Sequence, residues 1–473
     1  MIRNKTNVAN SLIYILLLAL ILRILFVLFG ADLYFPRENF MIDRDTWAWA
    51  KMFENLVKTG EYTINPGHEY GYFARMPGYS FFMGAFWLLT GKDWSAAFPI
   101  IAWIQILLDV VTVYLLYHFV ITFFKNKQTA LIAAILYACY PFIIVWTPVV
   151  YSESVSVFLM MLSLFLAAKN KNYWYLLFSG AALGAAVLCR PQIFLLLPLY
   201  AFVLRKPKHI KTVVVRGLVF FAGFIMLYGP WPIRNYINHD KIIFTQDLRG
   251  FGCWDEDVLS FLQYVYAVKS GWQPQRDQIV KNKPVTWPDI AYTSVEDSLK
   301  LEKAVWNAKH CSRGFSHQKG YWKESFDSVG CTNETAKLFT ELRQKQIKTN
   351  PLNFYLLIPL QNLKKAVFKS DLGKPKNNTM FVLGKLLFAY RTLLILLGVA
   401  GAVVAICRRK WQYWVPLLFA VFIYIALCFG TAPQFRNIEM RYFLHADIIL
   451  LIPAAWFISE LYNKIIKPHR SNG

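Results

Sequence analysis

The chain has 473 residues, of which 56% are hydrophobic and only 17% are charged, and its mean hydropathy is +0.36. A soluble protein of this size normally has about 25% charged residues. The apolar residues gather in runs of roughly 17 to 25, the length with which a helix crosses a bilayer core about 30 Å thick. This composition excludes a soluble enzyme, a disordered chain and a collagen-like fibre.

The net charge of +23 arises from 51 Lys and Arg against 28 Asp and Glu. In a soluble domain this excess would indicate nucleic acid, but here much of it lies in short clusters between apolar runs. Such clusters are typical of the cytoplasmic loops of membrane proteins. We therefore expect a membrane protein with no nucleic-acid partner.

The first apolar run, about 9–29, follows Arg3 and Lys5 and lacks a small-residue cleavage site, so we expect it to remain as a membrane span. Arg23 lies near one end of this run, and its side chain is expected to reach the membrane surface. Nine further runs predict a polytopic α-helical membrane protein with about ten spans. These runs lie near 97–123, 129–147, 153–168, 173–189, 191–205, 213–232, 381–406, 412–430 and 443–464.

Short basic clusters separate several of these runs. If ten spans alternate in direction, every cluster falls on the same side of the membrane as Arg3 and Lys5, which predicts that both termini are cytoplasmic. The clusters are Lys125 to Lys127, Lys169 to Lys171, Arg205 to Arg216, Arg408 to Lys410 and Lys467 to Arg470.

Two long polar segments then face the extracytoplasmic side. The first, 30–95, carries tryptophans between polar residues and predicts interfacial helices. The second, 233–380, is long enough to fold as a small α or α/β domain over the membrane part. The predicted organisation is a membrane module 1–232 that includes the first loop, the loop domain, and C-terminal membrane helices in 381–473.

Seven cysteines are too few for a disulfide framework,. Cys253, Cys311 and Cys331 share the second polar segment, where at most one disulfide can form, and Cys311 with Cys331 is the favoured pair. The cysteine and histidine spacings do not indicate a zinc site.

Carboxylates at the extracytoplasmic boundary are the first candidates for chemistry. Asp43 and Asp45 follow the first span and precede an amphipathic stretch. An acid held at the membrane surface beside a cavity can act as a general base or bind a divalent cation. Helix capping is the alternative, because a carboxylate before a helix accepts backbone N–H bonds. Spacing alone favours capping for Asp45.

Two more acids map to this boundary. Glu153 begins the fourth run, where capping competes with a role in a site. Glu439 lies with Arg441 and Tyr442 just before the last run.

Four arginines map to extracytoplasmic ends of apolar runs, against the tendency of basic residues to remain in the cytoplasm. A guanidinium fork matches phosphate oxygens, so phosphate binding is one reason for this position. Reaching out of the bilayer is the other. The four are Arg75, Arg190, Arg234 and Arg441.

Together these segments resemble the polytopic GT-C glycosyltransferases. The stretch Asp45-x-x-x-Trp49 with Asn55-Leu56-x-x-x-Gly60-Glu61-Tyr62 is similar to the first-loop motif of glycosyltransferase family 39, which holds protein O-mannosyltransferases and lipid A aminoarabinose transferases. Trp49 stands where Tyr is usual. The other elements, in family order, are Arg75-Met76-Pro77-Gly78-Tyr79, Tyr140-Pro141 with Ser152-Glu153, Leu188-Cys189-Arg190-Pro191, Pro230-Trp231-Pro232-Ile233-Arg234-Asn235-Tyr236 and Glu439-Met440-Arg441-Tyr442. Met76 replaces a proline of the family pattern, and His445 stands where a proline often occurs.

The resemblance implies a GT-C fold and an inverting transfer of a hexose or pentose from a polyprenyl-phosphate donor to an acceptor hydroxyl outside the cytoplasm. The acceptor would be a glycan, a lipid or a protein. Asp45 matches the catalytic acid residue of the family and would take the acceptor proton. The four arginines would meet the charge of the leaving phosphate. The expected supporting residues are Asp43, Glu153, Glu439 and Tyr442.

The metal requirement stays open at this stage. Asp43 and Asp45 have the spacing of a divalent-cation site, but arginines alone can meet a monophosphate leaving group. No inserted domain of the eukaryotic mannosyltransferase type is visible, which favours a bacterial member in the cell inner membrane.

A multi-pass lipid or sugar transporter is the competing prediction. It would explain the spans and the charges among them, but it requires neither a long folded segment on one side nor an acid at the edge of the first loop. A structural subunit of an assembly would leave the order of the motifs unexplained.

Overall fold

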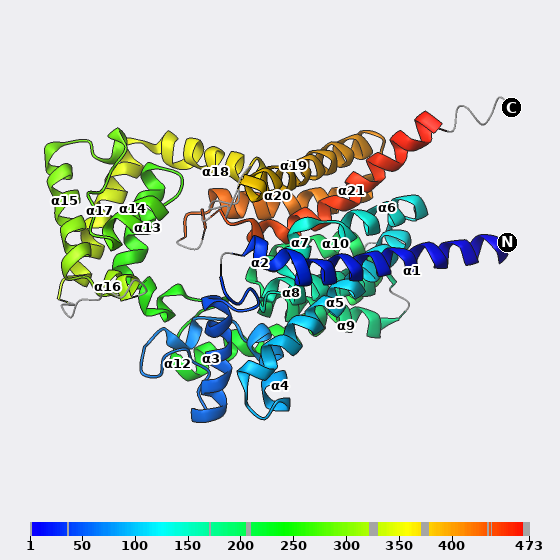
Figure 1. Ribbon diagram of the computed structural model, residues 1–473, viewed down its shortest axis with the longest axis horizontal. Coiled ribbons are helices and arrows are strands. Elements are labelled where there is room, and N and C mark those ends of the chain that lie inside the picture. Colours follow the sequence, from blue (N-terminus) through cyan, green and yellow to red (C-terminus); the bar gives the residue numbers. More distant parts are fainter. Residues whose placement is uncertain are drawn as a thin grey trace.

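The computed structural model describes residues 2–35, 37–169, 172–204, 210–320, 330–369, 378–432, 435–436 and 438–466, with side chains from residue 10 onward and not at 320 or 466. Every regular element in this part of the chain is helical (Figure 1). The beginning of α1 and the end of α21 lie at one end of the molecule, and the loop domain lies at the other. The tail cluster Lys467 to Arg470 falls outside the described residues, so the cytoplasmic location of the termini stays a prediction.

The membrane part contains the longest helices. Seven helices in the described residues are long and apolar enough to cross a bilayer. They are Asn10–Tyr34, Trp94–Phe123, Ser152–Lys169, Ile210–Tyr228, Asn378–Cys407, Trp411–Phe429 and Met440–Ile465. As elements these are α1 (Ile2–Leu25) continued through η1 (Phe26–Gly30) and α2 (Ala31–Tyr34), then α5 (Trp94–Phe123), α8 (Ser152–Lys169), α11 (Ile210–Tyr228), α19 (Asn378–Cys407), η8 (Trp411–Tyr413) with α20 (Trp414–Phe429), and α21 (Met440–Ile466).

The three remaining runs form shorter helices. Pro141 starts a new helix within the run 129–147, because proline is accepted at the first helical position but not in the interior of a helix,. Pro191 likewise starts a 3-10 segment after Arg190. The count of ten spans therefore stays a prediction beyond the seven long helices. The shorter elements are α6 (Lys127–Ala138), α7 (Pro141–Trp146), α9 (Tyr173–Cys189), η3 (Pro191–Leu199) and α10 (Tyr200–Leu204).

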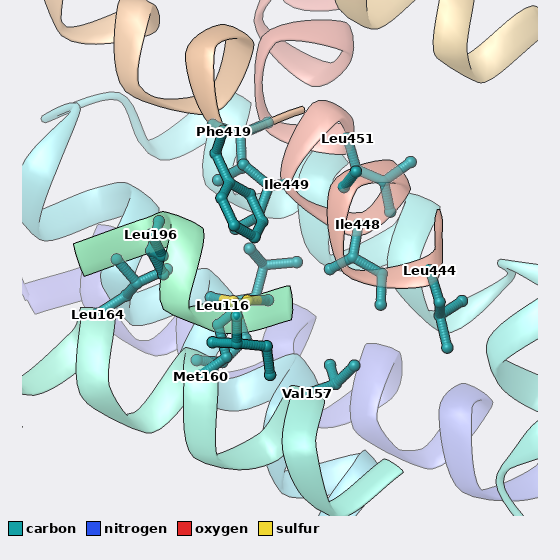
Figure 2. Close-up of a cluster of buried hydrophobic side chains, with 14 of the residues drawn as sticks. Leu116, Val157, Met160, Leu164, Leu196, Phe419, Leu444, Ile448, Ile449 and Leu451 are labelled. Atoms are coloured by element: carbon teal, nitrogen blue, oxygen red, sulfur yellow. The ribbon is translucent and has the colours of Figure 1, made fainter. Parts of the chain in front are cut away.

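The membrane core joins helices that are far apart in the sequence. Figure 2 shows Leu116 of α5, Met160 of α8 and Phe419 of α20 gathered with Ile448 of α21, and all four are fully buried. The N-terminal and C-terminal membrane helices therefore form one packed unit. Where α9 meets α11, a Cβ on Gly180 would collide with the backbone of α11, so glycine lets these helices approach closely,.

Arg23 does not reach the membrane surface, which corrects the sequence-based expectation. Its side chain is fully buried, and its Nε donates to Asp109 of α5 at 2.5 Å. Tyr137 also donates to this carboxylate, and Nη1 of Arg23 donates to the Ala138 carbonyl at 2.9 Å. A carboxylate on the neighbouring helix, which spacing in the sequence does not reveal, makes burial of the arginine possible.

The elements outside the membrane helices come from two parts of the chain. The first loop contributes α3 (Arg44–Thr59), η2 (Gly71–Phe73) and α4 (Pro77–Leu89). The second segment contributes α12 (Pro230–His239), η4 (Leu248–Gly250), η5 (Gly252–Trp254), α13 (Glu256–Val268), α14 (Gln273–Val280), η6 (Asp289–Ala291), α15 (Val295–His310), α16 (Arg313–Gly320), α17 (Thr332–Thr349), η7 (Asn353–Leu357) and α18 (Ile358–Val367).

The loop domain has its own apolar core. Phe261 and Tyr264 of α13 pack against Phe339 of α17 inside a cluster separate from the membrane core. A disulfide joins Cys311 to Cys331, the pair that the sequence favoured. Of the two fold classes expected for this segment, its described residues adopt the all-α one.

Candidate active site

Asp43, rather than Asp45, caps α3. The Asp43 carboxylate accepts the Arg44 N–H at 2.6 Å. It also accepts the Thr46 backbone N–H, and the Thr46 hydroxyl accepts the Asp43 N–H at 3.1 Å, so the two residues form a capping box,. Asp43 also pairs with Arg37 at 2.5 Å and accepts the Tyr151 hydroxyl at 2.9 Å. Asp43 thus fixes the start of α3, and Asp45 in the first turn is available for another role.

The Asp45 carboxylate lies between two arginines from distant parts of the chain. Oδ1 accepts from Nη2 of Arg75 at 2.7 Å, and Oδ2 accepts from Nη2 of Arg441 at 2.7 Å. Burial would raise the pKa of Asp45, but the charges of Arg441 and Arg75 outweigh it and hold this pKa well below its usual range,. Asp45 is therefore ionised at every physiological pH.

A buried glutamate joins Arg190 to this pair. Glu153, at the start of α8, is fully buried, and its Oε1 pairs with Nη2 of Arg190. Nε of Arg441 lies 3.9 Å from the same oxygen and donates to Glu439 at 2.8 Å. Glu153 and Glu439 thereby hold two cationic side chains close together that would otherwise repel each other.

Aromatic rings orient the guanidinium groups. The Arg75 guanidinium lies 4.5 Å from the Trp49 ring and 5.0 Å from the Phe251 ring. Tyr442 lies within 5.4 Å of the Arg441 guanidinium and 5.8 Å of that of Arg190. Trp49 presents the face of its ring to the Arg75 guanidinium, an arrangement that attracts a cation,.

Arg234 lies apart from this cluster. Its guanidinium donates to the carbonyls of Tyr62 at 3.0 Å and Tyr72 at 3.1 Å, and it is not among the described residues that line the cavities below. The structure brings Arg75, Arg190 and Arg441 together around Asp45 and uses Arg234 to tie α12 to the first loop.

A cavity of about 940 Å³ opens beside the arginine cluster. An apolar part of its lining comes from η3, α11 and α20. That part contains Phe194, Leu195, Leu197, Phe221, Phe224, Ile225 and Leu427. The loop domain contributes residues of the stretch 244–254 together with Leu262, Trp272, Arg276 and Gln318. A second cavity of about 340 Å³ is lined by Asp43, Trp146 and Tyr151. Asp45 and Arg441 line both cavities and stand between them.

Two buried donors of the cluster are left without partners. Nε of Arg75 and Nε of Arg190 have no hydrogen-bond acceptor among the residues that the structure describes. Unsatisfied buried N–H groups beside a cavity indicate that a ligand with acceptor oxygens completes the site. A phosphate group has that chemistry.

The donor set does not fit a divalent cation. Both Asp45 oxygens accept from arginines, and Asp43 is bound by Arg37 and Tyr151. Three positive side chains surround Asp45, and a cation would be repelled. Among the described residues, no group of three His, Cys, Asp or Glu side chains is placed to hold a metal ion.

Sequence reasoning missed Arg37, Phe251 and Tyr151. Tyr151 directly precedes the Ser152-Glu153 element and could have been included with it. Arg37 and Phe251 lie in polar stretches with no pattern that distinguishes them, so only the folded chain reveals their contacts.

Comparison with known proteins agrees with this geometry. Residues 74–231, a stretch that contains Arg75, Glu153 and Arg190, match a family model described as dolichyl-phosphate-mannose-protein mannosyltransferase. The archaeal oligosaccharyltransferase AglB from Archaeoglobus fulgidus, solved with an inhibitory peptide and a dolichol-phosphate, superposes with a TM-score of 0.55 at 15% identity over 99% of this chain. The chain has the GT-C fold of membrane glycosyltransferases. The predicted resemblance to the GT-C superfamily is thereby confirmed.

Two further structures of the Archaeoglobus fulgidus oligosaccharyltransferase are similar to this GT-C chain. The form tethered with an acceptor peptide gives a TM-score of 0.53 at 13% identity, and the apo form gives 0.52 at 15%, each over 98% of this chain. The chain spans only about half the length of these structures, 52%, 51% and 51%. No curated protein matches its sequence.

Proposed function

We propose that the chain is an inverting glycosyltransferase that moves a sugar from a polyprenyl-phosphate donor to an acceptor hydroxyl on the extracytoplasmic side of the membrane. The observation that carries this proposal is an ionised carboxylate, Asp45, held by arginines at the junction of a large, partly apolar cavity and a smaller one. In this proposal the protein lies in the cell inner membrane with both termini in the cytoplasm.

The apolar side of the large cavity suits the lipid of the donor. Phe194, Phe224 and Ile225 line it from η3 and α11, two elements of the membrane part. A prenyl chain is an apolar ligand that gains from such a surface. Because η3 begins directly after Arg190, a lipid bound along it would bring its phosphate to the arginines.

The arginines suit the leaving group. When the bond between the anomeric carbon and the phosphate oxygen breaks, the electron pair remains on the phosphate, which gains negative charge. Fixed cations at that position stabilise the transition state more than the ground state. Arg75, Arg190 and Arg441 would share this charge, and the free Nε donors of Arg75 and Arg190 would bind phosphate oxygens.

Asp45 would be the base. An acceptor hydroxyl in the smaller cavity attacks the anomeric carbon from the side opposite the phosphate, and Asp45 takes its proton, so one transfer inverts the configuration. In the free protein both Asp45 oxygens accept from arginines. A phosphate that draws Arg75 or Arg441 to itself leaves an Asp45 oxygen available for the hydroxyl and makes that carboxylate more basic.

The test is transfer by the full chain in detergent from radiolabelled polyprenyl-phosphate hexoses and pentoses to glycan, lipid and peptide acceptors. Asp45→Asn should lower turnover about 10²–10⁴-fold, the contribution of a positioned base. The matched control is Asp93→Asn, since Asp93 is an exposed carboxylate that caps α5 and lines neither cavity. Near-normal transfer by Asp45→Asn would exclude Asp45 as the base.

The same assay separates this proposal from a lipid or sugar transporter. A transporter would bind the lipid in the large cavity but would form no glycosidic bond to any acceptor. Absence of transfer with every donor and acceptor, together with movement of the lipid across a vesicle membrane, would favour the transporter.

A further inference from the structure

The large cavity extends beyond the arginine cluster to a wall made by the loop domain. The Arg75 guanidinium lies 5.0 Å from the Phe251 ring. Phe251 is three residues before Trp254, so their Cα atoms lie within about 11 Å of each other. Trp254 lines the cavity with Trp272, Arg276 and Gln318. The arginine cluster and this wall therefore line the same cavity, with Phe251 in contact with Arg75.

Two indole rings form the apolar part of this wall. Trp254 and Trp272 meet edge to face with their ring centroids 5.2 Å apart. Trp272 is only 5% exposed, and its Nε1–H has no acceptor among the described residues. A buried indole N–H normally has a hydrogen-bond partner. The unsatisfied donor on a cavity wall indicates a ligand that carries an acceptor oxygen.

The polar part of the wall is held in place by its own contacts. Nε2 of Gln318 donates to the Cys253 carbonyl at 2.6 Å, and Oε1 accepts from Nη1 of Arg276 at 3.3 Å. The Arg276 guanidinium lies 5.0 Å from the Trp272 ring. Aromatic surface with a few fixed polar groups is the pattern of sites that bind small polar ligands.

We propose that Trp254, Trp272, Arg276 and Gln318 bind the sugar of the donor lipid, an inference that rests on the proposed function. The C–H face of a sugar ring packs on indole, and its hydroxyls accept from the Trp272 and Arg276 N–H groups. The prenyl chain takes the apolar lining along η3, and the phosphate takes the arginines. A lipid-linked sugar laid across the cavity in this order places its ring against the loop domain.

The wall fits a neutral sugar. Arg276 is the charged residue of the wall, and its Nε pairs with Asp277 at 2.6 Å, so the charge is already compensated. A sugar carboxylate would have to compete with Asp277 for the guanidinium, whereas hydroxyls need only the remaining N–H groups. The part of the loop domain beyond Tyr236, which carries no part of the family resemblance, thereby determines which sugar the enzyme takes.

The experiment measures the affinity of the full chain in detergent for polyprenyl phosphate and for the same lipid bearing glucose, mannose, arabinose or glucuronate. The wild type should bind at least one neutral sugar lipid more tightly than bare polyprenyl phosphate. Trp272→Phe keeps an aromatic ring and removes the N–H, and Arg276→Gln removes the guanidinium. Each should weaken binding of that sugar lipid about tenfold, the effect of one hydrogen bond of about 1.4 kcal/mol, and leave binding of the bare lipid unchanged.

The matched control is Trp306→Phe on α15, an exposed tryptophan of the same domain that does not line the cavity. Equal losses for sugar-bearing and bare lipid, no loss for either, or the same loss in Trp306→Phe would overturn the proposal. A wild type that prefers the glucuronate lipid, or that binds no sugar lipid better than bare polyprenyl phosphate, would also overturn it. The proposed transferase activity is tested by turnover, whereas the proposed sugar-binding wall is tested by differences in affinity. Either proposal can therefore fail without the other.

Discussion

Two aspartates of this molecule are each bound by arginine beside tyrosine, and they differ in what they can do. Asp447 of α21 accepts from Nε of Arg391 at 2.7 Å, from the Tyr140 hydroxyl at 2.8 Å and from the Tyr424 hydroxyl at 2.6 Å. Asp447 and Arg391 are buried in the membrane part. The Asp45 side chain retains 30% of its exposure and lines two cavities.

The hydrogen-bond partners of the arginines around each aspartate explain why the two sites differ. Arg391 also donates to the Ala366 carbonyl at 2.7 Å and to Tyr424 at 2.9 Å, so its fork is engaged on all sides. Near Asp45, the Nε groups of Arg75 and Arg190 lack acceptors among the described residues. A saturated ion pair joins helices, whereas an unsaturated one beside a cavity can bind a ligand. Access and spare donors, rather than residue types, distinguish the candidate site.

The largest effect on stability is expected at Asp447. Asp447→Asn leaves Arg391 charged and buried without its carboxylate, and breaking such a pair costs about 3–5 kcal/mol. Unfolding in detergent should show this loss, while transfer per folded molecule remains. A variant with normal stability and strongly reduced transfer would place Asp447 in the catalytic machinery and break the comparison.

The arginines give the next largest effect. Lysine keeps the charge of Arg441 but loses the fork that joins Asp45 to Glu439,. Losing a charge-assisted hydrogen bond of about 1.5–3 kcal/mol corresponds to a fall in transfer of about 10- to 100-fold for Arg441→Lys.

Arg234→Lys is the informative counterpart, because the structure bonds Arg234 to two carbonyls outside the cavities. The turnover of this variant should stay within about twofold of the wild type, because losing a single weak hydrogen bond would have no larger effect. An equal fall in both variants would restore Arg234 as a phosphate ligand.

The smallest effect concerns a third aspartate, Asp257, which pairs with no arginine among the residues that the structure describes. Burial raises the pKa of Asp257 in the loop domain from 3.8 to about 6, although three backbone N–H groups bond its carboxylate. Because the folded state binds the proton more tightly than the unfolded state, its contribution to stability is present below pH 4 and is lost as the pH rises through 6. From pH 5 to pH 7 the loss should be about 1 kcal/mol.

Hydrogen exchange of α16, whose Gly314 and Phe315 N–H groups bond Asp257, measures this loss in the intact protein. The Asp257→Asn variant should not show the difference between the two pH values. Because amide exchange is itself base-catalysed, the comparison uses protection factors, the intrinsic rate divided by the observed rate at each pH. Lower protection of α16 at pH 5 than at pH 7 would contradict the expected sign.

Much of the membrane part could be predicted from the sequence, because a span must be long and apolar wherever it packs. Asp45, Arg75, Arg190 and Arg441 could also be predicted, since family motifs carry them. Ion pairs between helices that are distant in the sequence could not be predicted. Arg391 meets Asp447 because of the way α19 and α21 are rotated and packed, and no local pattern in the sequence encodes that packing.

Arg234 shows a second limit. Its motif and its boundary position are the same as those of the other arginines, but α12 directs its guanidinium to the first loop. A linear pattern states that a guanidinium is at the membrane edge. Only packing decides whether carbonyl oxygens of the protein or those of a ligand satisfy it.

The ion pair between Asp45 and Arg441 joins residues 396 positions apart in the chain. During synthesis, α3 and its carboxylate leave the ribosome long before α21 supplies the second arginine. Until α21 has been inserted, Asp45 has Arg75 alone, and the partition between the two cavities is missing. A nascent chain therefore has no complete site until its last membrane helix is in place.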